Sequence, residues 1–144
     1  MSRSSMRGFS LVEMAITILI LGMLFAFSIP AYQSISSSYK LKGATENLAA
    51  QLRVSREKAI ATGMEQPMHF TPNWLNSDYH IHYPSGFVPA KWKLPRGITF
   101  YTWTWNPIMY KDGRLSGSGI VVLQDTRGLK DTVSFQTSGL ILTK

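Results

Sequence analysis

The first thirty residues contain one long apolar run. The only polar side chain within residues 14–27 is Thr17, so the run offers no polar face to water. Counted from Phe9, 21 residues precede Pro30. At a rise of about 1.5 Å per residue, a helix of that length spans about 30 Å, the thickness of one bilayer core. The pattern predicts a membrane-spanning helix over residues 9–30.

After Pro30 the pattern becomes that of an amphipathic helix, with apolar side chains at three-, four- and seven-residue intervals. The apolar positions are Ile35, Tyr39, Leu41, Ala44, Leu48, Leu52, Ala59 and Ile60. Gly63 is a suitable C′ stop, so we expect the helix to continue over residues 31–63. Proline lacks an N–H, which predicts a kink at Pro30. Arg53 and Glu57 have the spacing of an i,i+4 ion pair.

From residue 64 onward the chain alternates short β-branched or aromatic runs with turn residues. We expect strands at Gln66–Phe70, Tyr79–Tyr83, Ile98–Trp103, Pro107–Tyr110, Gly119–Gln124, Thr132–Gln136 and Leu140–Thr143. Turns are expected at residues 71–78, at Asp112-Gly113 and at Ser138-Gly139, and a loop at residues 84–95. The sequence therefore predicts an α+β fold, in which a long N-terminal helix packs on an antiparallel β-sheet domain formed by residues 64–144.

Glu13 is the exception within the apolar run. A carboxylate in a membrane segment costs about 2.5–3.5 kcal/mol even on mild insertion scales, so it suggests a functional site. No Lys or Arg occurs between Arg7 and Lys40, so no basic side chain of this helix can pair with Glu13. We expect its partner to come from elsewhere.

Charge and composition set the broad class. The net charge is +7, and it falls to +5 without residues 1–8, which carry Arg3 and Arg7. Those two arginines predict a cytoplasmic N-terminal side, with everything after Pro30 across the membrane. The chain has no cysteine, which excludes disulfides and thiol chemistry. The mild basic bias would suit DNA or lipid, although solvated surface charge is the favoured interpretation.

The N-terminal features together resemble the type IV prepilin signal: the Gly8/Phe9 junction, Glu13 five residues into the mature chain, the apolar run and Pro30. The resemblance implies a leader, residues 1–8, cleaved after Gly8 by a prepilin peptidase, followed by N-methylation of Phe9. It also implies that Glu13 pairs with the Phe9 amine of a neighbouring subunit in a filament. An ordinary signal anchor or secretory signal peptide is the alternative, but Ser28-Ile29-Pro30 offers no convincing small-x-small cleavage site.

Two further stretches are similar to the GspH/FimT family: the helix end over residues 48–63 and the strand, D-G-R turn and strand over residues 108–123. This resemblance implies a minor pseudopilin of type II secretion or a minor pilin of type IV pili. Such a protein is anchored in the bacterial inner membrane, with its C-terminal domain in the periplasm or outside. It is not an enzyme and needs no cofactor, and its partners are other pilins and the inner-membrane assembly platform.

Some FimT-like proteins bind DNA through a C-terminal Gly-Arg-x-Arg motif, but the corresponding turn here, Ser138-Gly139-Leu140-Ile141, contains no arginine. A DNA-binding or adhesive tip pilin is therefore the alternative function. Its candidate contact surface combines cations with an aromatic ring and comprises Lys91, Trp92, Lys93 and Arg96. Strand alternation predicts Tyr101, Trp103 and Trp105 on one face and Phe100 with Thr102 on the other. We favour core packing and subunit contacts over nucleic-acid binding for these aromatics.

Three histidines complete the candidate chemistry. His80 and His82 alternate on one predicted strand, and His69 could lie on the neighbouring strand. Together they could bind Zn²⁺, but solvent-facing strand positions are the favoured interpretation and we predict no metal site. No nucleophile elbow, phosphate loop or paired-carboxylate site is recognisable in the sequence.

Overall fold

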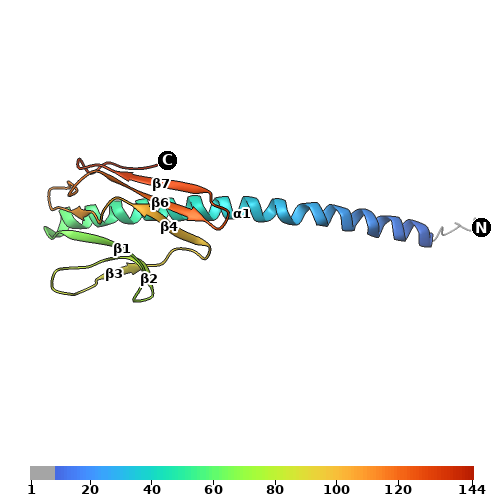
Figure 1. Cartoon of the computed structure of the whole chain (residues 1–144), viewed down its shortest axis with the longest axis horizontal. Coiled ribbons are helices and arrows are strands. Elements are labelled where there is room, and N and C mark those ends of the chain that lie inside the picture. The colour runs from blue at the N-terminus through green and yellow to red at the C-terminus, as the bar shows by residue number, and fades with distance from the viewer. Residues whose placement is uncertain (1–8) are drawn as a thin grey trace, which may run out of the picture. The chain divides into compact units, whose positions relative to one another are not determined.

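A computed structural model describes residues 9–144, apart from the side chains of Pro30 and Ala31. The chain divides into two compact units, and the boundary between them in the sequence falls between Ser36 and Ser37. A single helix, α1 (Leu11–Thr62), contributes residues to both units (Figure 1). The expected cleavage at Gly8 lies outside the described residues. The expected kink falls on Pro30, whose side chain also lies outside them, and both stay predictions.

The first unit consists of the apolar half of α1. Its large apolar side chains are all more than half exposed, from Leu11 at 85% to Ile20 at 51%. Among the described residues, α1 is the one helix that is long and apolar enough to cross a membrane. The fold thus contains the long apolar N-terminal helix that the sequence predicts.

The second unit begins with the amphipathic half of α1. This half buries Leu41, Ala44, Leu48, Leu52 and Ala59 of the stripe that the periodicity predicts, and Ala49 in addition. Ile60, which was also expected on the stripe, is 43% exposed. The helix ends at Thr62, and Gly63 follows with φ +66°, the left-handed conformation of a C′ glycine. The expected Arg53–Glu57 pair is absent, because Arg53 Nη2 donates to the Ile141 carbonyl at 2.9 Å and Glu57 pairs with Arg56 at 3.0 Å.

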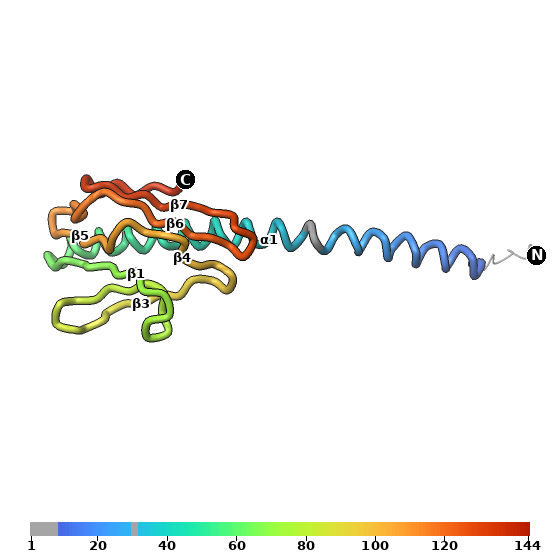
Figure 2. Tube along the Cα trace, viewed as in Figure 1, coloured from blue at the N-terminus to red at the C-terminus, as the bar shows by residue number. Residues whose placement is uncertain are grey.

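Eight strands follow the helix within the described residues. Their bounds are β1 Gln66–Trp74, β2 Ser77–Ile81, β3 Ala90–Trp92, β4 Ile98–Trp103, β5 Ile108–Met109, β6 Gly119–Asp125, β7 Lys130–Phe135 and β8 Ile141–Thr143. All pairings are antiparallel, and they form two four-stranded sheets with the orders β3-β2-β1-β5 and β4-β6-β7-β8. Within this unit, α1 lies beside the strands of both sheets (Figure 2).

The predicted strands are largely present, but the proline-rich region differs from the expectation. β3 occupies part of the expected loop and pairs with β2, so that Trp92 lies opposite Tyr79. β1 and β2 also extend into the expected turn at residues 71–78, with an irregular register between Phe70 and Trp74. This extension depends on left-handed backbone at Asn73, Leu75 and Asn76, which a propensity argument does not anticipate for leucine.

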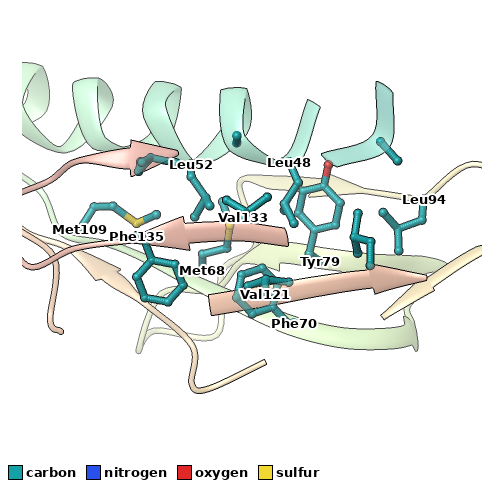
Figure 3. Packing of buried hydrophobic residues seen from close by; sticks show 14 of the residues in the cluster. Leu48, Leu52, Met68, Phe70, Tyr79, Leu94, Met109, Val121, Val133 and Phe135 are labelled. Carbon is teal, nitrogen blue, oxygen red and sulfur yellow. The ribbon is translucent and has the colours of Figure 1, made fainter. Parts of the chain in front are cut away.

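The core lies between α1 and the two sheets. Leu48 and Leu52 point from the helix toward Met68 and Phe70 of the first sheet and Val121 and Val133 of the second, all with at most 1% exposure (Figure 3). These side chains form one cluster with the remaining buried apolar residues, so the helix and both sheets depend on each other for burial.

A β-bulge in β4 overturns the predicted faces of the aromatic strand. Phe100 pairs with Leu123 and Thr102 with Val122, so Tyr101 is an extra residue without a cross-strand partner. The bulge puts Phe100 and Trp103 on the core side, with their rings 5.7 Å apart. Tyr101 and Trp105 are left 55% and 44% exposed.

Arg56 contacts two turns of the second unit, at the end of the unit where α1 terminates. Its Nε donates to the Gly113 carbonyl at 2.7 Å, from the D-G-R turn that the sequence predicts. Gly139, at the β7–β8 turn, has φ +88° and packs against the same arginine so closely that a Cβ would overlap Arg56 Nε and Gly113 O. Glycine at position 139 is therefore required both by conformation and by space.

Candidate functional site

Two side chains of the first turn cap the N-terminal end of α1. Ser10 precedes the first helical residue, and its Oγ accepts the Val12 N–H at 3.3 Å. Glu13 Oε2 accepts the Ser10 N–H at 2.9 Å. A serine and a glutamate three residues apart that each satisfy an N–H of the turn form a capping box. The motif Ser10-x-x-Glu13 is visible in the sequence, but our sequence interpretation missed it.

The capping box changes the physical account of Glu13. We expected a partner from outside this helix, whereas the structure supplies the Ser10 N–H and the positive end of the helix dipole. In the described part of the chain, no hydrogen bond reaches the second carboxylate oxygen. Glu13 can therefore cap its own helix and still offer one oxygen to a cation from another molecule.

Phe9 lies one residue before the cap, outside the helix. Its side chain is 80% exposed, so the described part of the chain leaves it accessible. The N-methylation of Phe9 and its pairing with Glu13 of a neighbour stay predictions.

The expected basic and aromatic surface is only partly available. Lys91 and Arg96 are exposed, but Lys93 Nζ donates to Asn76 Oδ1 at 2.7 Å. The Trp92 ring stacks on the buried Tyr79 ring at 5.3 Å and packs against the core. Trp92 thus has a structural role, and the structure does not present it as a free platform for a base or sugar.

The three histidines gather on one face of the β1–β2 hairpin. His69 lies opposite His80 in the register, and the three ring centroids are 5.5–5.7 Å apart. Trp74 stacks on His80 at 4.1 Å, and His80 Nδ1 bonds with Thr71 Oγ1 at 3.2 Å. No group of three metal-ligating side chains in residues 9–144 is arranged to hold a metal ion.

Burial and mutual repulsion disfavour the charged forms of two of these rings. Desolvation, followed by the charge of His82, lowers the pKa of His69 below its usual 6.5. Desolvation, followed by the charges of His69 and His82, also lowers the pKa of His80. Both effects favour the neutral forms of His69 and His80, whose rings stack with their centroids 5.6 Å apart.

Comparison with known proteins identifies the N-terminal segment alone. No curated protein and no solved structure matches the chain. Residues 3–29 match the prokaryotic N-terminal methylation motif, and this range includes Phe9, the capping box and the apolar run. The chain therefore carries a prokaryotic N-terminal methylation motif, which leads into a long helix followed by antiparallel sheets.

Proposed function

We propose that this chain is a minor pilin or pseudopilin of the GspH/FimT kind, a structural subunit that acts in the assembly or at the tip of a filament. A prepilin peptidase cleaves it after Gly8 and Phe9 is then methylated. The observation that carries the proposal is the methylation motif on an otherwise exposed apolar helix. The same helix anchors the subunit in the inner membrane before assembly.

The geometry of Glu13 supports a change of partner during assembly. In a single chain one carboxylate oxygen is bonded to the Ser10 N–H. A neighbouring subunit would bring the positive amine of its own Phe9 to the second oxygen. Both charges are costly in lipid, and their pairing reduces that cost for both subunits.

Apolar side chains on α1 after Pro30 also favour assembly. Ile35 and Tyr39 were expected on the buried stripe of the helix, but they are 57% and 73% exposed. The first buried apolar residue of the second unit is Leu41. The β6–β7 turn reaches α1 at Ser38, through the hydrogen bond from Arg127, and the strands cover the helix only from about this level onward. Exposed aromatic and aliphatic groups of this size suit contacts with neighbouring subunits.

Substitutions at Glu13 separate the cap from the ion pair. Glu13→Gln keeps a side chain that can complete the capping box but removes the charge, whereas Glu13→Ala removes both. We expect both variants to be processed normally and both to enter filaments at least about tenfold less than the wild type, since a charged hydrogen bond contributes about 1.5–3 kcal/mol. Subunits in sheared filaments and in membranes would be quantified by immunoblot.

The glutamine variant decides the role of the charge. Normal filament entry by Glu13→Gln with loss by Glu13→Ala would mean that capping alone is required, and the proposed intersubunit pair would be wrong. Normal entry by both variants would remove Glu13 from assembly altogether.

Processing has its own test at Gly8. Gly8→Leu puts a branched side chain where the peptidase needs close access to the backbone, so we expect the uncleaved precursor to accumulate. Intact-mass spectrometry of the purified chain distinguishes the two forms. A cleaved and methylated mass for the variant would contradict the assigned cleavage site.

The neighbouring subunits would show which machine the chain serves. A photoreactive amino acid in place of the exposed Ile35 can crosslink neighbours in cells. Captured pseudopilins would assign the chain to a secretion filament, and captured pilins to a pilus. Crosslinks only to unrelated membrane proteins would contradict the filament proposal.

A further inference from the structure

The turn between β6 and β7 lies beside the start of the helix in the second unit. Arg127 Nη2 donates to Ser38 Oγ at 3.0 Å, which fixes the tip of the hairpin at this level of α1 (Figure 2). The loop before β4 is adjacent, because a Cβ on Gly97 would lie 3.5 Å from Thr126 Cγ2. Three segments distant in sequence therefore meet at one end of the unit, which we call the basal end.

The basal end carries exposed cations. Lys40 follows Ser38 on the helix, Arg96 precedes Gly97, and Lys130 is the first residue of β7 after the hairpin turn. Within the described part of the chain, no carboxylate lies within 4 Å of the charged groups of these three residues. Lys130 Nζ instead lies 3.4 Å from the centroid of the exposed Tyr101 ring.

The acidic residues near this end accept hydrogen bonds from other groups or lie beside other lysines. Asp78, which lines a hollow together with Arg96, accepts the backbone N–H groups of Asn73 and Leu94. Asp125 is buried, pairs with Arg127 at 3.0 Å, and accepts the backbone N–H groups of Arg127 and Leu129. Glu46 and Asp131 line a shallow hollow with two other lysines, Lys42 and Lys144. The charge left uncompensated at the basal end is positive.

The basal end is also tethered close to the membrane that holds the first unit. Only seven residues, or eight helical steps, lie between Ile29, the end of the apolar run, and Ser37, the first residue of the second unit. As helix they extend about 12 Å, whereas the headgroup layer is about 5–8 Å thick. The remaining distance is within the Debye length of about 8 Å at physiological salt.

We propose that the basal cations Lys40, Arg96 and Lys130 dock the second unit on anionic lipid headgroups of the membrane that anchors α1. The docking rests on the membrane anchoring in the proposed function but adds a partner, the lipid surface, and a role for the domain's charge. Docked subunits are held in one orientation before they leave the membrane, and entry into a filament breaks these contacts.

The chain suits a direct optical test because it contains no cysteine. Thr126→Cys, at the tip of the β6–β7 turn, allows a single fluorophore to be attached. The full chain is reconstituted into phosphatidylcholine vesicles with or without phosphatidylglycerol, both containing a lipid with a spin-labelled headgroup that quenches nearby fluorophores. We expect stronger quenching with phosphatidylglycerol, and loss of this difference at about 0.5 M salt, where the Debye length is only about 4 Å.

Charge variants identify the surface that is responsible. The triple variant Lys40→Gln, Arg96→Gln, Lys130→Gln should lower the ratio of docked to undocked chains by about tenfold or more, since each cation near an anionic surface contributes roughly fivefold. The matched control Lys58→Gln, Lys111→Gln, Arg114→Gln removes the same charge from residues on the last turns of α1 and in the D-G-R turn. The control should dock like the parent chain, and far-UV circular dichroism would check that both variants fold.

Three outcomes would overturn the docking proposal. Equal quenching in the two kinds of vesicle would show that the second unit does not bind anionic lipid. An equal loss of quenching in the control variant would show that the three basal cations are not specifically responsible for it. Binding of a DNA oligonucleotide that needs the basal cations, without lipid-dependent quenching, would assign the surface to nucleic acid instead. Vesicle flotation distinguishes a failure of the docking proposal from a failure of the membrane anchoring, because a chain that is not anchored would not float with the lipid.

Discussion

Gly139→Ala should destabilise the second unit more than the same substitution does at a turn glycine whose surroundings leave room for a Cβ. The backbone at Gly139 has φ +88°, and a Cβ there would overlap Arg56 Nε and Gly113 O. Gly128 in the β6–β7 turn is a matched control, because its φ is +86° and its nearest neighbour, Gln124 Nε2, lies at 3.4 Å. The two substitutions are chemically identical and differ in what the new methyl group meets.

The magnitude follows from two separate costs. A left-handed alanine costs about 1–2 kcal/mol at either position. At Gly139 the methyl group must also displace Arg56 from the Gly113 carbonyl, a hydrogen bond from a charged donor worth about 1.5–3 kcal/mol. We therefore expect Gly139→Ala to cost about 2.5–5 kcal/mol and Gly128→Ala about 1–2 kcal/mol.

Urea unfolding in detergent micelles measures this difference without interference from the apolar helix. All four tryptophans lie between Trp74 and Trp105, so tryptophan fluorescence reports the second unit alone. With a slope of about 1–3 kcal/mol per molar urea, the two variants should differ in midpoint by about 1 M.

A double-mutant comparison tests the mechanism itself. In an Arg56→Gln background the arginine contact is already lost, so Gly139→Ala should cost less than it does in the parent chain. Equal costs for Gly139→Ala and Gly128→Ala, or strict additivity of Gly139→Ala with Arg56→Gln, would refute the claim that Arg56 bridges the two turns.

Two further predictions concern stability. Burial and neighbouring imidazoles lower the pKa of His69 and His80, so below about pH 6.5 these two side chains bind fewer protons in the folded chain than in the unfolded chain. The free energy of unfolding should be highest above that pH and fall as the pH drops through the lowered pKa values, and His80→Gln should weaken this dependence in urea titrations. Leu48→Ala should cost about 2–5 kcal/mol, because Leu48 is fully buried, whereas Val54→Ala at an exposed site of the same helix should cost less than about 1 kcal/mol in the same assay.

The helix could be predicted from the sequence because its signals are local. The run of apolar residues gives its first half, and the spacing of Leu41, Leu48 and Leu52 gives the buried face of its second half. Gly63 marks its end within one residue. Periodicity cannot show where the tertiary cover of a helix begins, which is why Ile35 and Tyr39 were wrongly placed on the buried stripe.

The strands were predicted better than their faces. Alternation assigns faces correctly only while the register is regular. The residues around Tyr101 contain no signal of the bulge that moves Phe100 and Trp103 to the same side. β3 was missed because three residues among prolines carry almost no local signal, and the strand exists because Trp92 can stack on Tyr79 of its neighbour. These features depend on packing between segments distant in sequence.

The N-terminal site shows a different kind of omission, with a consequence for function. Charge alone suggested that Glu13 needs an external partner, yet Ser10 provides a local N–H. A carboxylate with no local partner would favour the aqueous state, whereas a capped carboxylate enters the membrane with part of its cost already offset. The second oxygen is then the group on which a neighbour can act. Under the proposed function, the capping box would thus allow Glu13 to be stable in a membrane-anchored subunit and to become fully paired only in a filament.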